Sequence, residues 1–250
     1  MRPDAPAHMT PALAETSPTT RGRILAAVYL FVVTCGIIAQ VVIADRLVDY
    51  TDAAKTSANI LANTTLYRLA FTIFMLEMVA QVALSAMFYD LLKPVNRSLA
   101  RIAAIIGVTG SGIKTMARLF FYAPLILLGG APYLAAIPPA QLEALSLALI
   151  RINNQGAAIA LVFFGFETLF RGWLMVHAGF LPRFLGVLSM IGGLGWLAFL
   201  WPPFGFQAFG LVAVFALAGT IATTGWLLVR GVDDEKWRTR ASLAATSVWR

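Results

Sequence analysis

The chain has 250 residues, of which 59% are hydrophobic and 12% are charged, and its net charge is +7. Soluble domains carry about 25% charged residues, so half that share, together with long apolar runs, excludes an ordinary soluble domain and indicates a membrane protein. The Lys and Arg residues lie in short segments beside the apolar runs, as in the cytoplasmic loops of membrane proteins, which argues against nucleic-acid binding. The lone cysteine, Cys35, lies inside an apolar run and gives neither an internal disulfide nor a zinc motif.

The N-terminal part of the chain is predicted to be a tail followed by a membrane helix. Residues 1–20 are rich in Pro, Ala and Thr and lack hydrophobic periodicity, which predicts a disordered cytoplasmic tail. Residues 24–43 are twenty largely apolar residues, the length that crosses a bilayer. A signal peptide is the alternative, but its apolar core is usually about 7–15 residues long. An uncleaved first helix is therefore favoured.

The rest of the apolar pattern predicts five further spans. They are expected at 69–92, 102–128, 142–177, 185–201 and 206–229. The polar stretch 44–67 has Ala54, Ala58 and Leu61 at helical spacing, and we expect a short surface helix there. At about 1.5 Å per residue, segment 142–177 is too long for a hydrocarbon core of about 30 Å. Two explanations of this length are open. Either the polar run 151–156 interrupts the helix, or the helix is continuous and tilts in the membrane or protrudes from it.

Six spans place both ends of the chain on one side of the membrane. Basic residues gather in both tails and in the loop 93–101, whereas the loop 129–141 has no Lys or Arg. This bias predicts that both termini are cytoplasmic. We therefore expect an all-α polytopic integral membrane helix bundle of about six transmembrane helices in a bacterial inner or plasma membrane. Its transmembrane domain is predicted over 21–231, followed by a polar cytoplasmic C-terminal tail over 232–250.

Several segments taken together resemble one family. The most specific are Pro-Val-Asn-Arg-Ser-Leu at 94–99 and Leu-Pro-Arg-Phe-Leu-Gly at 181–186. Over about 21–231 the chain resembles the bacterial multi-pass membrane family catalogued as domain of unknown function (DUF) 4386. The resemblance implies a membrane fold of six or seven helices and no assigned activity. The family's usual pattern is more apolar around Arg171, so the resemblance gives that residue no family-wide role.

Ionisable residues inside the predicted spans are the main functional signal. At a helix centre, Arg, Lys or Asp costs about 2.5–3.5 kcal/mol on insertion scales, so such residues usually face the bundle interior and find partners. The chain has six of them: Glu77, Lys114, Arg118, Arg151, Glu167 and Arg171. Glu167 and Arg171 are four residues apart in the favourable order for a helical ion pair. We interpret them as a structural ion pair that points into the bundle or toward the cytoplasmic interface.

The other ionisable residues suggest a ligand site. Glu77, Gln81 and Ser85 form a polar stripe along the second span, and Glu77, Arg118 and Arg151 are expected to meet at one depth in its outer half. The candidate ligand-binding residues are Glu77, Gln81, Lys114, Arg118, Arg151 and Asn154. Two arginines can hold a carboxylate or phosphate in bidentate geometry. The alternative is a structural network that sets the register of the helices.

Small residues predict where helices approach closely. Ala103, Gly107, Ser111 and Thr115 recur every four positions, and Ser189 and Gly193 form another such pair. Small side chains allow membrane helices to pack with their backbones close together.

These patterns favour a membrane protein that binds or transports a small anionic or lipophilic molecule. The alternative is a membrane scaffold or interaction protein without a small-molecule site. An intramembrane enzyme is the weaker alternative, because no nucleophile–base set is visible and no cluster has metal-ligand spacing. The sequence thus predicts no catalytic residue, no metal and no cofactor. The expected partners are the lipid bilayer and a small-molecule or lipid ligand, and the oligomeric state is open.

Overall fold

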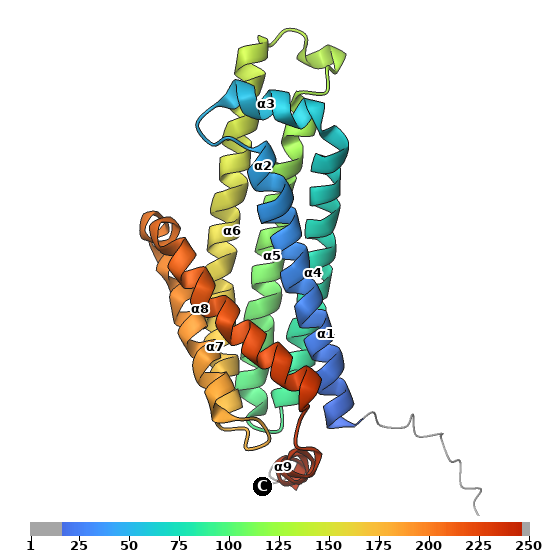
Figure 1. The fold of residues 1–250 in the computed structure, drawn as a ribbon, viewed down its shortest axis with the longest axis vertical. Coiled ribbons are helices and arrows are strands. Elements are labelled where there is room, and N and C mark those ends of the chain that lie inside the picture. Colours follow the sequence, from blue (N-terminus) through green and yellow to red (C-terminus); the bar gives the residue numbers. More distant parts are fainter. Residues whose placement is uncertain (1–16, 247–250) are drawn as a thin grey trace, which may run out of the picture.

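The structure is a computed structural model, and it describes residues 17–246. Within that range the chain is all-helical and forms an elongated bundle, as the sequence predicts (Figure 1). Both ends of the described chain lie at one end of this bundle, here called the terminal end. A short helix, α3, runs across the bundle near the opposite end, here called the α3 end.

Five segments of the described chain are long and apolar enough to cross a membrane. They are Pro18–Leu47, Thr64–Leu92, Pro139–Val176, Arg183–Leu200 and Pro202–Val229. The remaining long helix, α5 (Arg97–Leu127), is not among them. It corresponds to the expected third span, but it carries Lys114 and Arg118 beside a run of Thr, Gly and Ser residues. The total number of spans therefore stays a prediction.

The first segment is a continuous helical rod made of three parts. They are α1 (Pro18–Ile37), the π-helical η1 (Ile38–Ala44) and α2 (Asp45–Leu47). Ser17 caps the rod, because its Oγ accepts a hydrogen bond from the Thr20 amide at 3.1 Å. Of the tail expected over 1–20, residues 1–16 lie outside the described part of the chain. Residues 18–20 belong to α1, which corrects the predicted boundary.

The expected surface helix is present as α3 (Ala53–Ala62), which crosses the end of the bundle (Figure 1). Asp52 starts this helix, since its Oδ1 accepts a hydrogen bond from the Lys55 amide at 2.9 Å. The chain then enters α4 (Thr64–Leu92) and returns through α5. Asn96 caps α5 by accepting from the Leu99 amide at 2.9 Å.

The long segment 142–177 forms a single helix. This helix, α6 (Pro139–Val176), has 38 residues and no break at 151–156. At 1.5 Å per residue it is about 57 Å long, so it extends beyond a hydrocarbon core of about 30 Å. Its first turns, up to the level of α3, form the tall part of the α3 end (Figure 1).

Helices α7 (Arg183–Trp196) and α8 (Pro202–Val229) form a hairpin through the short η3 (Leu197–Leu200). Glycines bring α7 against α6: a Cβ added at Gly165 would lie 2.9 Å from the Gly193 carbonyl oxygen. One added at Gly172 would lie 2.7 Å from the Gly186 carbonyl oxygen. The close approach expected at Gly193 is therefore present. Helix α8 crosses the bundle obliquely and reaches α1 at the terminal end (Figure 1).

The C-terminal segment docks onto the bundle through α9 (Asp234–Thr246). Asp234 Oδ1 accepts a hydrogen bond from the Thr19 amide at 2.8 Å, and the Thr19 hydroxyl donates to the Val232 carbonyl at 2.6 Å. The Trp237 indole donates to the Leu91 carbonyl at 2.9 Å. The polar tail expected over 232–250 is thus helical and held to α1 and α4 up to residue 246.

Candidate functional site

The first buried polar group joins α4, α5 and α6 in the half of the bundle nearer the α3 end. It consists of Glu77, Lys114, Arg118 and Asn153 and is here called the Arg118 cluster. Lys114 Nζ lies 2.7 Å from Glu77 Oε1, and Glu77 is only 5% exposed. A Cβ added at Gly36 of α1 would lie 3.2 Å from that same oxygen. The glycine therefore leaves room for the carboxylate between the helices.

Arg118 is the centre of this cluster. It is 2% exposed, and its Nη1 donates to Asn153 Oδ1 at 3.1 Å. Its guanidinium carbon lies 3.4 Å from the centroid of the Phe74 ring, a cation–π contact. Among the described residues, Arg118 Nε and Glu77 Oε2 are buried without a hydrogen-bond partner. Lys114 therefore takes the carboxylate, and among the described residues the side-chain acceptor of Arg118 is an amide oxygen.

Arg151 does not join the cluster, contrary to the expected meeting of Glu77, Arg118 and Arg151. Its side chain is exposed, and its Nη2 donates to the backbone carbonyl of Tyr50. At 3.6 residues per turn, Arg151 and Asn153 point about 200° apart around α6. Asn153 therefore faces Arg118 while Arg151 faces outward.

Asn154 links the cluster to the loop 48–52. The Asn153 amide donates to Asn154 Oδ1 at 3.0 Å, and the Asn154 side chain lies close enough to the Tyr50 hydroxyl to affect its pKa. Tyr50 also lies within electrostatic range of the Arg118 guanidinium. Burial raises the pKa of the Tyr50 hydroxyl, and the nearby Asn154 side chain opposes this rise. The hydroxyl is thus a neutral group at the α3 end of the cluster.

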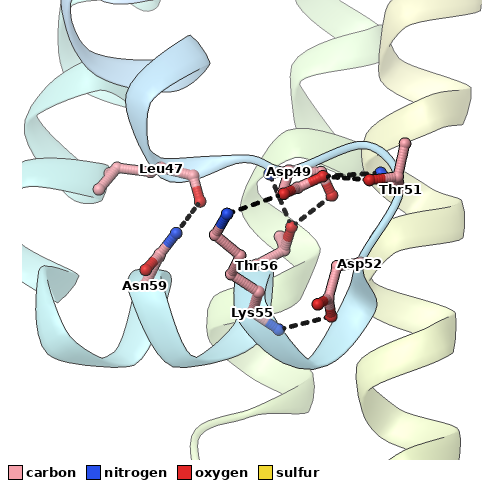
Figure 2. A network of polar contacts seen from close by, with 7 residues as sticks. All are labelled: Leu47, Asp49, Thr51, Asp52, Lys55, Thr56 and Asn59. Carbon is pink, nitrogen blue, oxygen red and sulfur yellow. Dashed lines mark hydrogen bonds and ion pairs between the residues drawn. The ribbon is translucent and has the colours of Figure 1, made fainter.

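The loop 48–52 is held over this end of the bundle by a network around Asp49 (Figure 2). The Asp49 carboxylate accepts from the Thr51 amide at 3.0 Å, from the Thr51 hydroxyl at 2.6 Å and from Lys55 at 3.1 Å. The Asp49 backbone exchanges two hydrogen bonds with the Thr56 hydroxyl, at 2.8 and 2.9 Å. The Thr51 hydrogen bonds and then Lys55 hold the pKa of Asp49 well below its usual range.

Beside this loop lies an open polar cleft of about 410 Å³. Its lining residues include Asp45, Arg46, Asp49, Tyr50, Lys55 and Asn59. Tyr50 therefore lines the cleft on one side and contacts Asn154 on the other. Sequence reasoning did not single out Tyr50, because no local pattern indicates a contact with a residue about one hundred positions away.

The second buried polar group lies nearer the terminal end and joins α1, α4, α6 and α8. It consists of Tyr29, Ser85, Glu167, Arg171 and Thr220 and is here called the Arg171 cluster. The Ser85 hydroxyl donates to Glu167 Oε1 at 3.0 Å, and Arg171 Nη1 lies 4.0 Å from the same oxygen. Arg171 Nη2 donates to the Tyr29 hydroxyl at 3.1 Å, and the Tyr29 and Thr220 hydroxyls hydrogen-bond at 2.9 Å.

A small cavity of about 10 Å³ adjoins this second group, which is room for about one water molecule. Ser85, Glu167 and Arg171 line it together with apolar residues of α4, α5 and α6. Gly107 of α5 makes the arrangement possible: an added Cβ would lie 2.5 Å from both Glu167 Cδ and Ser85 Oγ. The predicted small-residue stripe on α5 thus makes room for the buried Glu167 carboxylate and also lets the helices pack closely.

One protein-family model matches the part of the chain that contains both clusters. The family model described as "Domain of unknown function (DUF4386)" matches residues 24–231. The chain belongs to this family. No curated protein and no solved structure matches the chain. Both clusters and the loop 48–52 lie within the matched residues, whereas α9 lies outside them.

In this DUF4386 protein, the predicted site residues divide among three places. Glu77, Lys114 and Arg118 come together, and Asn154 adjoins them through Asn153. Gln81 is half-buried on α4, one turn from Glu77 and one turn from Ser85. Arg151 lies at the surface. Glu167 and Arg171 both lie inside the bundle, and they are 2% and 4% exposed.

Proposed function

We propose that this DUF4386 protein lies in a bacterial cell membrane with both termini cytoplasmic and binds a small anion at the Arg118 cluster. The observation that carries the proposal is the incomplete pairing of Arg118. This guanidinium is buried in the bundle, its Nε has no acceptor among the described residues, and its one side-chain acceptor is the neutral Asn153.

The charge balance of the cluster supports an anionic ligand. Glu77 neutralises Lys114 at 2.7 Å, so Arg118 adds an unneutralised positive charge. A charged side chain at membrane depth is costly unless it is paired, and an unsatisfied buried donor adds about 1–3 kcal/mol. A halide, carboxylate or phosphate oxygen beside Arg118 would offset both costs, because charge-assisted hydrogen bonds to guanidinium are strong.

The α3 end supplies a polar route to this position. The cleft beside the loop 48–52 is lined by Tyr50, whose hydroxyl contacts Asn154, and Asn154 accepts from Asn153 next to Arg118. Displacing Tyr50 would open the cluster toward the cleft. Two sets of hydrogen bonds would then keep the loop in its closed position. Arg151 donates to the Tyr50 carbonyl, and Asp49 accepts from Thr51 and Lys55.

A second function, as a scaffold without a ligand, is supported by a different observation. Phe74 covers the face of the Arg118 guanidinium, and Glu77, Lys114 and Asn153 join α4, α5 and α6. A fully structural cluster would need nothing else. The intramembrane enzyme remains the weaker alternative: Ser111, the serine in the small-residue stripe of α5, donates its hydroxyl to the Gly107 carbonyl of its own helix at 2.9 Å.

Thermal unfolding in lipid nanodiscs with chloride, acetate or phosphate distinguishes these functions. A ligand that binds only the folded protein stabilises it by about 2.7 kcal/mol at one hundred times its Kd. We expect at least one anion to raise the Tm of the wild type with saturation, and R118Q to abolish that rise. R101Q is the matched control, because Arg101 is an exposed arginine on the same helix.

The outcomes are distinct. Retention of the rise in R118Q would overturn the anion site, and no rise with any anion in any variant would favour the scaffold. If R118Q does not fold, R118K is used, since it keeps the charge but loses the planar fork. The anion site then requires weaker but saturable stabilisation in R118K.

A further inference from the structure

Glu167 and Glu77 are both buried, but they are paired very differently. Lys114 Nζ lies 2.7 Å from Glu77, whereas the closest cation to Glu167, Arg171, lies 4.0 Å away. Charge-assisted N–H···O bonds are about 2.7–2.9 Å long. Glu77 therefore has a close ion pair, and Glu167 does not.

Other groups hold Arg171 in its position. Its guanidinium carbon lies 4.1 Å from the centroid of the Phe88 ring, and its Nη2 donates to the Tyr29 hydroxyl at 3.1 Å. A weak contact to the Thr168 hydroxyl at 3.5 Å adds to these. The Arg171 guanidinium is thus held by contacts with α1 and α4, and its Nη1 is the nitrogen that faces Glu167.

The surroundings of Glu167 contribute few other charges. Across the cavity α4 presents Ser85 and the half-buried Tyr89, and α5 presents Ala103, Ala104 and Gly107. Among the described residues that line the cavity or belong to the Arg171 cluster, the ionisable ones besides Glu167 are Arg171, Tyr89 and Tyr29. An ionised carboxylate without a close cation in an apolar medium becomes neutral by taking up a proton.

The cavity provides the access that such a proton needs. It is bounded by Glu167, Ser85 and Arg171 at one side and by Tyr89, Leu92 and Ala100 toward the terminal end. Its volume of about 10 Å³ admits about one water molecule. A single water there would exchange a proton with the Glu167 carboxylate, on the side of the cluster that faces the terminal end.

We propose that Glu167 is a proton-binding site, loaded from the terminal end of the bundle through this cavity. The Glu167 carboxylate takes up one proton from a hydronium ion and becomes a neutral carboxylic acid, while Ser85 keeps donating to Oε1. One O–H bond forms on the carboxyl group and one O–H bond of the hydronium ion breaks to leave water, and the Arg171 cluster gains one unit of positive charge. The site is separate from the Arg118 cluster and does not depend on anion binding.

Infrared difference spectroscopy in lipid bilayers tests the proposal, because a protonated carboxyl group has its own C=O stretching band. We expect wild type at mildly acidic pH to show such a band, which shifts in deuterated water and is lost at alkaline pH. E167Q should abolish it. E77Q is the matched control and should keep it, because Glu77 belongs to the Arg118 cluster and has its own close partner in Lys114 at 2.7 Å. R118Q should also keep it, which separates this proposal from the anion site.

A wild type without the band at any pH in the stable range would overturn the proposal. So would a band that survives in E167Q and disappears in E77Q. If E167Q does not fold, S85A provides the readout. Loss of the Ser85 hydrogen bond should move the frequency of a Glu167 band, and an unmoved band would assign it to another residue.

Discussion

Lys114 of α5 and Glu77 of α4 are joined by a buried ion pair with an N–O distance of 2.7 Å. Removing one partner of a buried pair leaves an uncompensated charge and typically costs about 3–5 kcal/mol. We therefore expect K114M to lower the free energy of unfolding in mixed micelles by about this amount. The double variant E77Q/K114M should recover part of the loss, since it leaves no unpaired carboxylate.

The exposed pair between Lys93 and Asp90 is the control for this experiment. Its N–O distance is similar, 2.6 Å, but both side chains are exposed to solvent. Exposed pairs contribute about 0–1 kcal/mol, so K93M should have little effect. A loss in K114M no larger than that in K93M would show that the buried pair contributes little to stability.

Gly107 is predicted to be intolerant of any side chain. A Cβ there would lie 2.5 Å from Glu167 Cδ and from Ser85 Oγ. Because overpacking typically costs about 1–3 kcal/mol, G107A should lower the free energy of unfolding by that order. On the same helix, a Cβ at Gly112 would meet nothing within 4 Å. G112A should therefore stabilise the helix by about 0.5–1 kcal/mol, and equal effects of the two substitutions would contradict the packing around Glu167.

The loop 48–52 should respond to pH through Asp49. Its pKa in the folded protein is lowered by the Thr51 hydrogen bonds and by Lys55. The stability that it contributes is therefore fully present above the ordinary Asp pKa of about 3.9 and is lost as the pH falls through the lower folded value. We expect the hydrogen-exchange protection factors of residues 48–56, which correct for the intrinsic pH dependence of exchange, to be unchanged from neutral pH down to that ordinary value and to fall only at lower pH.

The variant D49N should show faster exchange of this loop already at neutral pH. D90N, at the other end of α4, is the control and should leave the exchange of 48–56 unchanged. A loss of protection in the wild type well above the ordinary Asp pKa would contradict the role assigned to the Asp49 carboxylate.

Gly231 should control the docking of α9. Its φ is +71°, and an added Cβ would lie 2.5 Å from Thr19 Cγ2. G231A should therefore displace the segment that hydrogen-bonds Thr19 and increase proteolytic cleavage after residue 231. Gly179 also has a positive φ, +77°, but a Cβ there would meet nothing within 4 Å. G179A thus measures backbone strain alone, and it should not increase cleavage of α9.

The fold was largely predictable because each membrane span has a pattern that can be recognised in its own stretch of sequence. A run of about twenty apolar residues can satisfy its backbone in a bilayer only as a helix. The inward direction of Glu167 and Arg171 follows from their four-residue spacing, which places both on one helix face. None of these inferences requires knowledge of a distant part of the chain.

The membership of the candidate site was predictable only in part. Glu77, Lys114 and Arg118 were selected because they are charged at similar depth, and the structure brings them together. Arg151 was selected by the same reasoning, but depth says nothing about direction around the helix axis. Asn153, two residues away, faces Arg118 instead. A rotation of α6 about its axis by half a turn would exchange their roles.

The sequence by itself determined that this is an all-helical membrane protein of the DUF4386 family, where its helices lie and which buried charges need partners. Apolar length and helical spacing are local properties, and they do not depend on how the helices pack. Only the tertiary structure decided that Lys114 lies against Glu77, that Tyr29 and Phe88 contact Arg171, and that Asn153 faces Arg118. Those contacts depend on the rotation and crossing of helices that are distant in the chain, which packing of the whole bundle sets.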